Sequence, residues 1–484
     1  MPFSSPRHAR RTLMLVALVP AGAGCAGCAL IPPPVTPAAP VRATFPATTV
    51  TLPEEPNARD GSVDTPWQML IADDDARRVI ALALEHNRDA HIAALRIEQA
   101  RAQYGIARGA LLPPIDGSAG GTIARSRGVT TEQYSTAIGV SGWEVDLFGR
   151  LRSRNRPAME QVLATVAAER GVRLALVSDV ASQYFAWRRA RAQRVLAERT
   201  LQAVNESVSL TRALVNAGAT TELDLRSAEG QRQGVMISAL SFARDAEQAR
   251  NALELLVGTP LPADLAPSDE LTSIGVIADV PPGLPSELLQ RRPDILEAEH
   301  TLRAAEANIG VARAAFFPSI RLTGSLGRGS DQLSSLFSAG TGLWSLVPQL
   351  SVPLFRGGQN RAALTAAQLA ARVEVATYER TIQRAFREVA DALVATSTFR
   401  ALVEERGVQI AAQQRRLQLA DLRYRRGEDA YLPVLTAQQD LFSAQQGLLD
   451  AQFGRLTSQL ALYRAHGFVD CAPFADYRPD PFSR

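Results

Sequence analysis

The 484-residue sequence contains no lysine. All 52 of its basic side chains are arginines, which excludes Schiff-base chemistry and the phosphate-binding lysine of P-loop proteins. Only three cysteines are present, too few for a disulfide framework or for a metal site with several thiolates. No stretch approaches the roughly 18 consecutive apolar residues of a membrane-spanning helix, so none is expected.

Charge of one sign is also scarce. The formal net charge is +3, and Arg7, Arg10 and Arg11 supply that excess near the N-terminus. The rest of the chain is balanced, which excludes the basic footprint of a nucleic-acid-binding protein. The few histidines are scattered, and no Ser/His/Asp arrangement or pair of carboxylates predicts an active site. We therefore expect neither enzyme activity nor a metal site.

Residues 1–27 are typical of a bacterial export signal. A basic start and a short apolar stretch are followed by small residues and two cysteines, Cys25 and Cys28. Lipoprotein signals end with small residues before a cysteine that becomes lipidated, and the spacing allows either one. The proline-rich tether over residues 28–66 favours Cys28 as the lipid attachment site. The alternative is a cleaved signal with incidental cysteines. Ala29 favours sorting to the outer membrane, by resemblance to other lipoproteins, and a lipid would anchor the chain without spanning the membrane.

The two halves of the chain repeat the same sequence motifs in the same order. Residues 107–115 (ARGALLPPI) match residues 312–320 (ARAAFFPSI), and residues 210–218 (LTRALVNAG) align with residues 419–427 (LADLRYRRG). The offsets of 205 and 209 residues are nearly equal, which is typical of an internal two-fold repeat.

Each half is expected to contain a helix, two short strands, a very long helix, a tight turn and a further helix. The predicted first repeat is 67–284, with strands at about 114–125 and 133–146, a long helix at 150–217, a helix at 222–257 and an equatorial segment at 258–284. The second is 285–467, with strands at about 318–328 and 342–355, a long helix at 359–426 and a helix at 432–466, before a tail at 468–484.

The long helices follow from periodicity. Between residues 359 and 426 there is no proline and one interior glycine, and apolar residues recur at three- and four-residue steps. A helix of this length extends about 100 Å and needs neighbours along its whole length. One arginine cluster on the first long helix predicts a solvated, salt-bridged face, and it comprises Arg188, Arg189, Arg191 and Arg194.

The expected strands alternate apolar and polar residues. Trp344, Leu346 and Leu350 alternate with Ser345 and Gln349. Segments of about ten residues with one apolar face suit a membrane β-barrel, and the alternative is a small soluble sheet packed on a helix. Four strands cannot close a membrane barrel, for which about eight is the minimum. Because open edges do not survive in lipid, several chains would have to share one barrel.

Together these features resemble the TolC-type outer-membrane factors. The longest runs that carry the resemblance are residues 143–152 (WEVDLFGRLR), 284–300 (LPSELLQRRPDILEAEH) and 312–320 (ARAAFFPSI). With the lipoprotein signal, they are most similar to the OprM-like lipoprotein branch, which serves resistance-nodulation-division efflux pumps. The resemblance extends from Cys28 to about Gly467.

The resemblance implies an α+β membrane protein that forms a homotrimer. Each chain would give four strands to one trimeric, twelve-stranded transmembrane β-barrel, continued by a long periplasmic α-helical barrel with a mixed equatorial region. The trimer would be lipid-anchored in the outer membrane of a Gram-negative bacterium, with no cofactor besides the lipid on Cys28. It would be the passive exit duct of a tripartite efflux pump for drugs or other small molecules, opened by a periplasmic membrane-fusion adaptor and an inner-membrane transporter.

The turns that follow the two long helices are the candidate functional tips. Gly218 and Gly427 occupy equivalent turns, where a sharp reversal needs the positive φ that glycine allows. A solvated loop is the alternative to a docking role. The remaining candidate adaptor contacts are Ala219, Thr220, Glu428 and Asp429.

The resemblance also implies a gate, which is held shut by bonds that must break when the channel opens. In TolC-type channels a tyrosine and an aspartate link inner and outer helices, and Tyr424 and Asp224 stand at these places. The family's assisting arginine falls at Asp429 here, so Arg425 or a neighbouring arginine must replace it. Asp421 is the candidate for a pore-lining acidic ring, with a solvated helix face as its alternative.

Two other functions fit parts of the sequence. One is an export duct for polypeptides, which the lipoprotein signal and the OprM-like runs disfavour. The other is a lipid-anchored periplasmic coiled coil without a pore, which the alternating strands disfavour.

Overall fold

The computed structural model describes residues 31–33, 37, 40–41, 67–265 and 291–467. The expected signal, Cys25, Cys28, most of the tether, most of the equatorial segment and the tail lie outside these residues. The elements are α1 (Trp67–Leu70), α2 (Asp74–His86), α3 (Arg88–Gly109), β1 (Asp116–Ser126), β2 (Val129–Val145), α4 (Arg150–Asn216), α5 (Glu222–Val257), α7 (Pro293–Ala314), β3 (Ser319–Ser330), η1 (Leu333–Ser335), β4 (Gly342–Ser351), α8 (Gln359–Arg425) and α9 (Leu432–His466).

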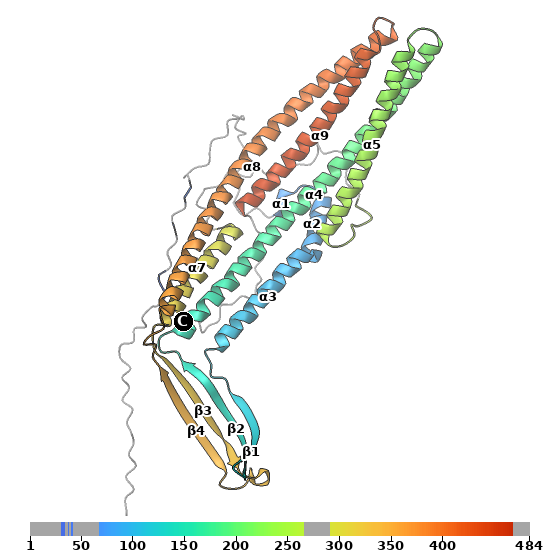
Figure 1. Ribbon diagram of the computed structural model, residues 1–484. Helices are drawn as coiled ribbons and strands as arrows, with labels where there is room; N and C mark the ends of the chain where they lie inside the picture. Colours follow the sequence, from blue (N-terminus) through green and yellow to red (C-terminus); the bar gives the residue numbers. More distant parts are fainter. Residues whose placement is uncertain (1–30, 34–36, 38–39, 42–66, 266–290, 468–484) are drawn as a thin grey trace, which may run out of the picture.

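The molecule is elongated, with a sheet at one end and helical hairpins at the other (Figure 1). Helices α4 and α8 have 67 residues each and therefore extend about 100 Å. Helix α4 packs against α3, α5, α7 and α9, whereas α8 packs against α7 and α9. No helix among the described residues combines the length and the hydropathy needed to cross a membrane.

The run at residues 143–152 forms the joint between β2 and α4. The carboxylate of Asp146 accepts hydrogen bonds from the backbone N–H groups of Leu151 and Arg152, both at 3.0 Å, and so caps the first turn of α4. Gly149 supplies the left-handed conformation before the helix, with a φ of 72°. Glu144 pairs with Arg150 across the joint. These contacts fix the direction in which the long helix leaves the sheet.

The four strands form one antiparallel sheet in the order β1-β2-β3-β4. Strand β2 begins at Val129 rather than at 133, because a two-residue turn allows Ser126 to pair with Val129. Strand β4 ends at Ser351 rather than at 355, because its partner Ser319 is the first residue of β3. The turn at 127–128 and the first residue of β3 therefore set the two strand ends.

One face of the sheet is apolar over most of its length. The register places Trp344 and Leu346 of β4 beside Leu326 and Gly324 of β3, and Ile138 of β2 continues the row. These apolar side chains are largely exposed in the single chain; Trp344, for example, is 77% exposed. The edges of β1 and β4 have no strand neighbour within the described chain. The apolar face and the two edges therefore need partners outside the chain.

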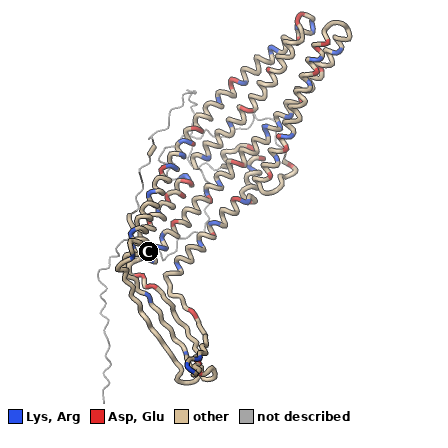
Figure 2. The backbone as a smooth tube through the Cα atoms, viewed as in Figure 1, with Lys and Arg blue, Asp and Glu red and all other residues tan. Residues whose placement is uncertain are grey.

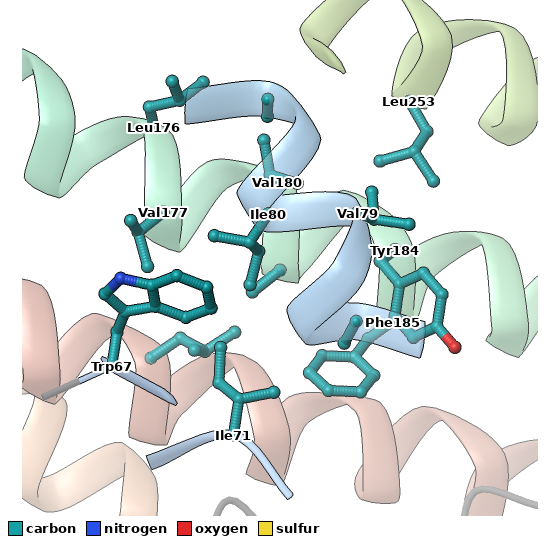
Figure 3. Close-up of a cluster of buried hydrophobic side chains, with 14 of the residues drawn as sticks. Trp67, Ile71, Val79, Ile80, Leu176, Val177, Val180, Tyr184, Phe185 and Leu253 are labelled. Atoms are coloured by element: carbon teal, nitrogen blue, oxygen red, sulfur yellow. The ribbon is translucent and has the colours of Figure 1, made fainter. Parts of the chain in front are cut away.

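A compact core lies midway along the molecule, where α1 and α2 pack on α4, α5 and α9. In Figure 3, Trp67 lies beside Ile80 of α2 and Val177 of α4, and Val79 lies beside Tyr184 of α4. Aromatic and branched side chains that meet in this way exclude water and hold the N-terminal helices against the long helix.

One expectation about α4 is wrong. Arg188 does not lie on a solvated face, since it is 1% exposed and forms an ion pair with Asp73 at 2.6 Å. The hydroxyl of Tyr184 donates to the same carboxylate at 3.2 Å. Asp73 also caps α2, accepting from the N–H of Ala76 at 2.9 Å. The covering helix comes from far earlier in the chain, so a local charge pattern could not reveal the burial.

Candidate gate and docking tips

Both tips have the same backbone geometry. Gly218 has a φ of 71° and Gly427 a φ of 73°, which confirms the positive φ predicted for the two turns. The N–H of Gly218 donates to Val215 O and that of Ala219 to Leu214 O; Gly427 and Glu428 repeat both bonds. This is a Schellman motif, which satisfies the last carbonyl groups of a helix as the chain reverses. The two repeats therefore present matching turns at one end of the molecule (Figure 1).

Asp224 organises the first tip. Its side chain accepts hydrogen bonds from the hydroxyl groups of Thr220, at 2.7 Å, and Thr221, at 2.8 Å. Thr221 in turn caps α5 by accepting from the N–H of Asp224, which completes a capping box. Burial raises the pKa of Asp224, but the hydrogen bonds from Thr220 and Thr221 outweigh it, and the pKa falls below its ordinary value.

Tyr424 joins the two hairpins of one chain. The residue is buried, and its hydroxyl donates to Oγ1 of Thr211 on α4 at 3.4 Å. Its ring meets Tyr431 edge-on, with ring centroids 5.3 Å apart. The surrounding apolar cluster is drawn from three other helices, α4, α5 and α9, and comprises Val204, Val208, Ala228, Val235 and Val434. Among the described hydrogen bonds, Tyr424 and Asp224 have separate partners, so the gate bond between them stays a prediction.

The charged tip residues pair within their own hairpin. Arg423 holds Asp429 through two hydrogen bonds, at 2.5 and 3.1 Å. Arg425 bonds Asp421 one helical turn away at 2.7 Å. The Arg423 guanidinium lowers the pKa of Asp429. Asp421 thus lies beside a cation, which would neutralise much of the acidic ring predicted from the sequence.

Tyr431 is a tip residue that the sequence analysis missed. It is 1% exposed, and burial is the main cause that raises its pKa to about 12. The charges of Tyr424, Asp224 and Asp421 raise this pKa further. Tyr431 therefore packs as a buried neighbour of the predicted gate residue Tyr424. Its place in the sequence, between the tip glycine and Pro433, gives no sign of its burial.

The outer surface of each tip carries an apolar side chain that was also missed. Leu223 is 75% exposed and Leu432 is 65% exposed. Each lies five residues after its tip glycine, so the repeat places both at equivalent positions. Gly218, Ala219, Gly427 and Glu428 are exposed beside them, whereas Thr220 and Asp429 are half-buried. The two tips thus each carry one exposed leucine at the start of the helix that follows the turn.

No group of three or more His, Cys, Asp or Glu side chains in the described ranges could hold a metal ion. His300 bonds Glu160 through Nδ1 at 2.9 Å, which joins α7 to α4. This histidine therefore has a structural partner between two helices.

The family model for outer membrane efflux proteins matches residues 79–259 and 284–468. The toluene efflux pump outer membrane protein TtgC of Pseudomonas putida is 40% identical over 450 residues, covering 91% of this chain and 92% of TtgC. The cation efflux system protein CusC of Escherichia coli is 38% identical over 447 residues, covering 91% of this chain and 95% of CusC.

Among solved structures, the fold is similar to the open state of the MtrE outer membrane channel of Neisseria gonorrhoeae. The TM-score is 0.83 at 36% identity, covering 90% of this chain and 97% of MtrE. The similarity thus extends over most of both chains.

Proposed function

This chain belongs to the outer membrane efflux protein family, and we propose that it is the outer-membrane exit duct of a tripartite efflux pump. The observation that carries this proposal is the match of both repeats to the family, on a fold that joins a four-stranded sheet to two 67-residue helices. Solutes would pass through the duct passively, with energy supplied by an inner-membrane transporter. Relatives are named for exporting toluene and cations, so the family relationship alone assigns no single substrate.

The trimer follows from the sheet. Its four strands leave the edges of β1 and β4 open, and a sheet in lipid must close on itself. The fold is that of the trimeric channels in this family, in which three chains together close one barrel of twelve strands in the outer membrane. The exposed apolar face of each sheet, which includes Trp344 and Leu346, then contacts lipid.

A lipid on Cys28 would reinforce this placement. Ile31, three residues after Cys28, lies against Gly310 near the sheet end of α7; a Cβ on Gly310 would come within 3.2 Å of the Ile31 backbone. Ile31 therefore lies close to the end of α7 that leads into the sheet. This is the position that an acyl chain on Cys28 requires.

Replacing Cys28 with serine is expected to abolish incorporation of radiolabelled palmitate into the protein. The matched control is Cys25→Ser, which removes the other candidate thiol and is expected to leave labelling unchanged. Labelling that survives Cys28→Ser and disappears in Cys25→Ser would assign the lipid to Cys25 instead.

The tips are the proposed contact with a periplasmic adaptor. We expect Leu223→Ser with Leu432→Ser to reduce pump-dependent resistance to a toxic solute at least fourfold, because both exposed apolar side chains of the docking surface are lost. The measurement is the minimum inhibitory concentration in a host that lacks its own outer-membrane channel and carries a matching adaptor and transporter.

The control for this experiment is Leu255→Ser. Leu255 is 81% exposed on α5 but lies near the equatorial end of that helix, far from the tip. Resistance should be retained in this variant, and trimer bands on unheated gels should be equal in all variants. Full resistance in the tip variant would contradict a docking role for these leucines.

Acid is expected to loosen the first tip. Because the pKa of Asp224 is lowered from 3.8 in the folded protein, its contribution is complete above that value and is lost as the pH falls through the lower folded-state pKa. Conductance of the trimer in a planar bilayer should therefore be steady from about pH 7 to 5 and rise below about pH 4. Asp224→Asn should reduce this rise. A rise centred near pH 6 would contradict a role for Asp224, because its folded-state pKa lies below 3.8.

A further inference from the structure

The apolar face of the sheet ends in arginines at the end that carries the β1–β2 turn and the β3–β4 loop, called here the hairpin end of the sheet. Arg125 of β1 lies on the same face as Ile123, and Arg328 of β3 lies on the same face as Leu326, because side chains two residues apart point to one side. Leu326 pairs with Trp344, so this aromatic side chain lies one step below Arg328. Figure 2 shows the strands uncharged over most of their length, with basic residues gathered at the hairpin end.

A third arginine occupies the turn itself. Arg127 and Gly128 connect β1 to β2, and Arg127 has a φ of 51°, the one positive φ at a non-glycine position in the described ranges. Such turns favour Asn or Gly at this position, because a Cβ is strained there. The chain therefore keeps a guanidinium at the tip of the hairpin despite the conformational cost, which is typical of a functional position.

The three guanidiniums are not neutralised by the chain. Within the described residues, none of them forms an ion pair, and the side chain of Arg328 donates to the carbonyl oxygens of Phe337 and Ser338, at 2.7 and 3.1 Å. The carboxylate nearest to Arg125 on this face is Glu132, which accepts from the hydroxyl of Tyr134 at 3.2 Å. Asp331 follows β3 and lies beside Ser330. The hairpin end of the sheet therefore carries three arginines against two carboxylates, which leaves it with a positive charge.

We propose that Arg125, Arg127 and Arg328 bind the phosphate groups of a phosphorylated lipid in the outer leaflet of the membrane. The helices extend into the periplasm, so the hairpin end faces the outside of the cell. Arginine forks bind phosphate through paired hydrogen bonds, and an aromatic side chain just below them is typical of the membrane interface. The apolar row that begins at Leu326 continues directly below the arginines, which suits the acyl chains of a lipid and offers nothing to a free phosphate ion.

The test compares two lipids on the purified full-length trimer. The probes are a bisphosphorylated, acylated disaccharide and the same lipid without its phosphates, and binding is measured by native mass spectrometry. The wild type should bind the phosphorylated lipid about tenfold more tightly. Replacing Arg125, Arg127 and Arg328 with glutamine should abolish this difference. Equal binding of both lipids by the wild type would overturn the proposal, as would full competition by millimolar inorganic phosphate.

Two further variants distinguish a loss of lipid contacts from a change in the structure of the β3–β4 loop. Arg125→Gln with Arg127→Gln leaves the Arg328 hydrogen bonds in place, and it should still weaken binding of the phosphorylated lipid several-fold. Arg125→Lys with Arg127→Lys keeps the charge but not the paired hydrogen bonds, so it should bind more tightly than the glutamine variant and less tightly than the wild type. The control is Arg372→Gln, an exposed arginine on α8 away from the sheet, which should behave as the wild type. Wild-type conductance measured in parallel tests the channel itself, so failure of lipid binding and failure of the proposed function are distinguishable.

Discussion

The double variant Asp224→Ala/Tyr424→Phe is expected to conduct several-fold more current than the wild-type trimer in a planar bilayer. Tyr424→Phe removes the hydrogen bond that joins α8 to Thr211 on α4, and Asp224→Ala removes the carboxylate that holds the two threonines of the first tip. Each lost bond is worth about 1 kcal/mol. Three bonds in each of three chains would shift a closed–open equilibrium by up to about 9 kcal/mol, enough to convert a mostly closed population into a mostly open one.

A matched control is Tyr378→Phe, which makes the same substitution on the same long helix. Tyr378 is buried against α7, far from the tip, so its loss of a hydroxyl should not change conductance. Equal conductance in the double variant and the wild type would move the gate elsewhere, with Asp421 and Arg425 as the next candidates. Trimers that conduct no current with or without the substitutions would contradict the channel function.

Replacing Arg292 with alanine is expected to destabilise the helical region by about 3 kcal/mol. Arg292 is buried and bonds Asp294 and Glu388, with nitrogen–oxygen distances of 2.6 and 2.8 Å. It also donates to the carbonyl oxygen of Ala465 at 2.9 Å, and so ties the start of α7 to α8 and to the end of α9. Alanine would leave these acceptors without their buried donor. The measurement is the temperature at which the trimer loses its helical circular dichroism.

Arg384 provides the control, because it pairs with the same carboxylate from the solvent side. Its side chain is 73% exposed and lies 2.9 Å from Glu388. Arg384→Ala should change stability by about 0.5 kcal/mol or less, since exposed ion pairs are hydrated in both states. Equal effects of the two substitutions would show that burial of Arg292 adds nothing, contrary to the expectation.

Much of the fold was predictable because it depends on local preferences. The absence of proline over residues 359–426 and the three- and four-residue spacing of apolar side chains identified α8, which spans Gln359–Arg425. Alternation identified the strands, but not where they end: β2 starts at Val129 because of a turn that the pattern did not indicate. Strand ends depend on pairing partners, and those are fixed only when the sheet forms.

The features of the candidate tips were also predictable only in part. The repeat located both turns, and glycine was required there because the backbone has a positive φ at each. The partner of Tyr424 could not be read from the sequence, because Thr211 lies 213 residues earlier in the chain. Tyr431 was missed because nothing local separates a buried tip tyrosine from a solvated one.

The sequence by itself determined the two-fold repeat, the length of the helices, the reversal at Gly218 and Gly427 and the two faces of the sheet. Each of these follows from backbone preferences or from the spacing of apolar residues over a few turns. Only the tertiary structure decided that Asp73 neutralises Arg188 and that Tyr424 meets Tyr431. The physical reason is that such contacts depend on the rotation of each helix against its neighbours, which is set by packing over the whole molecule.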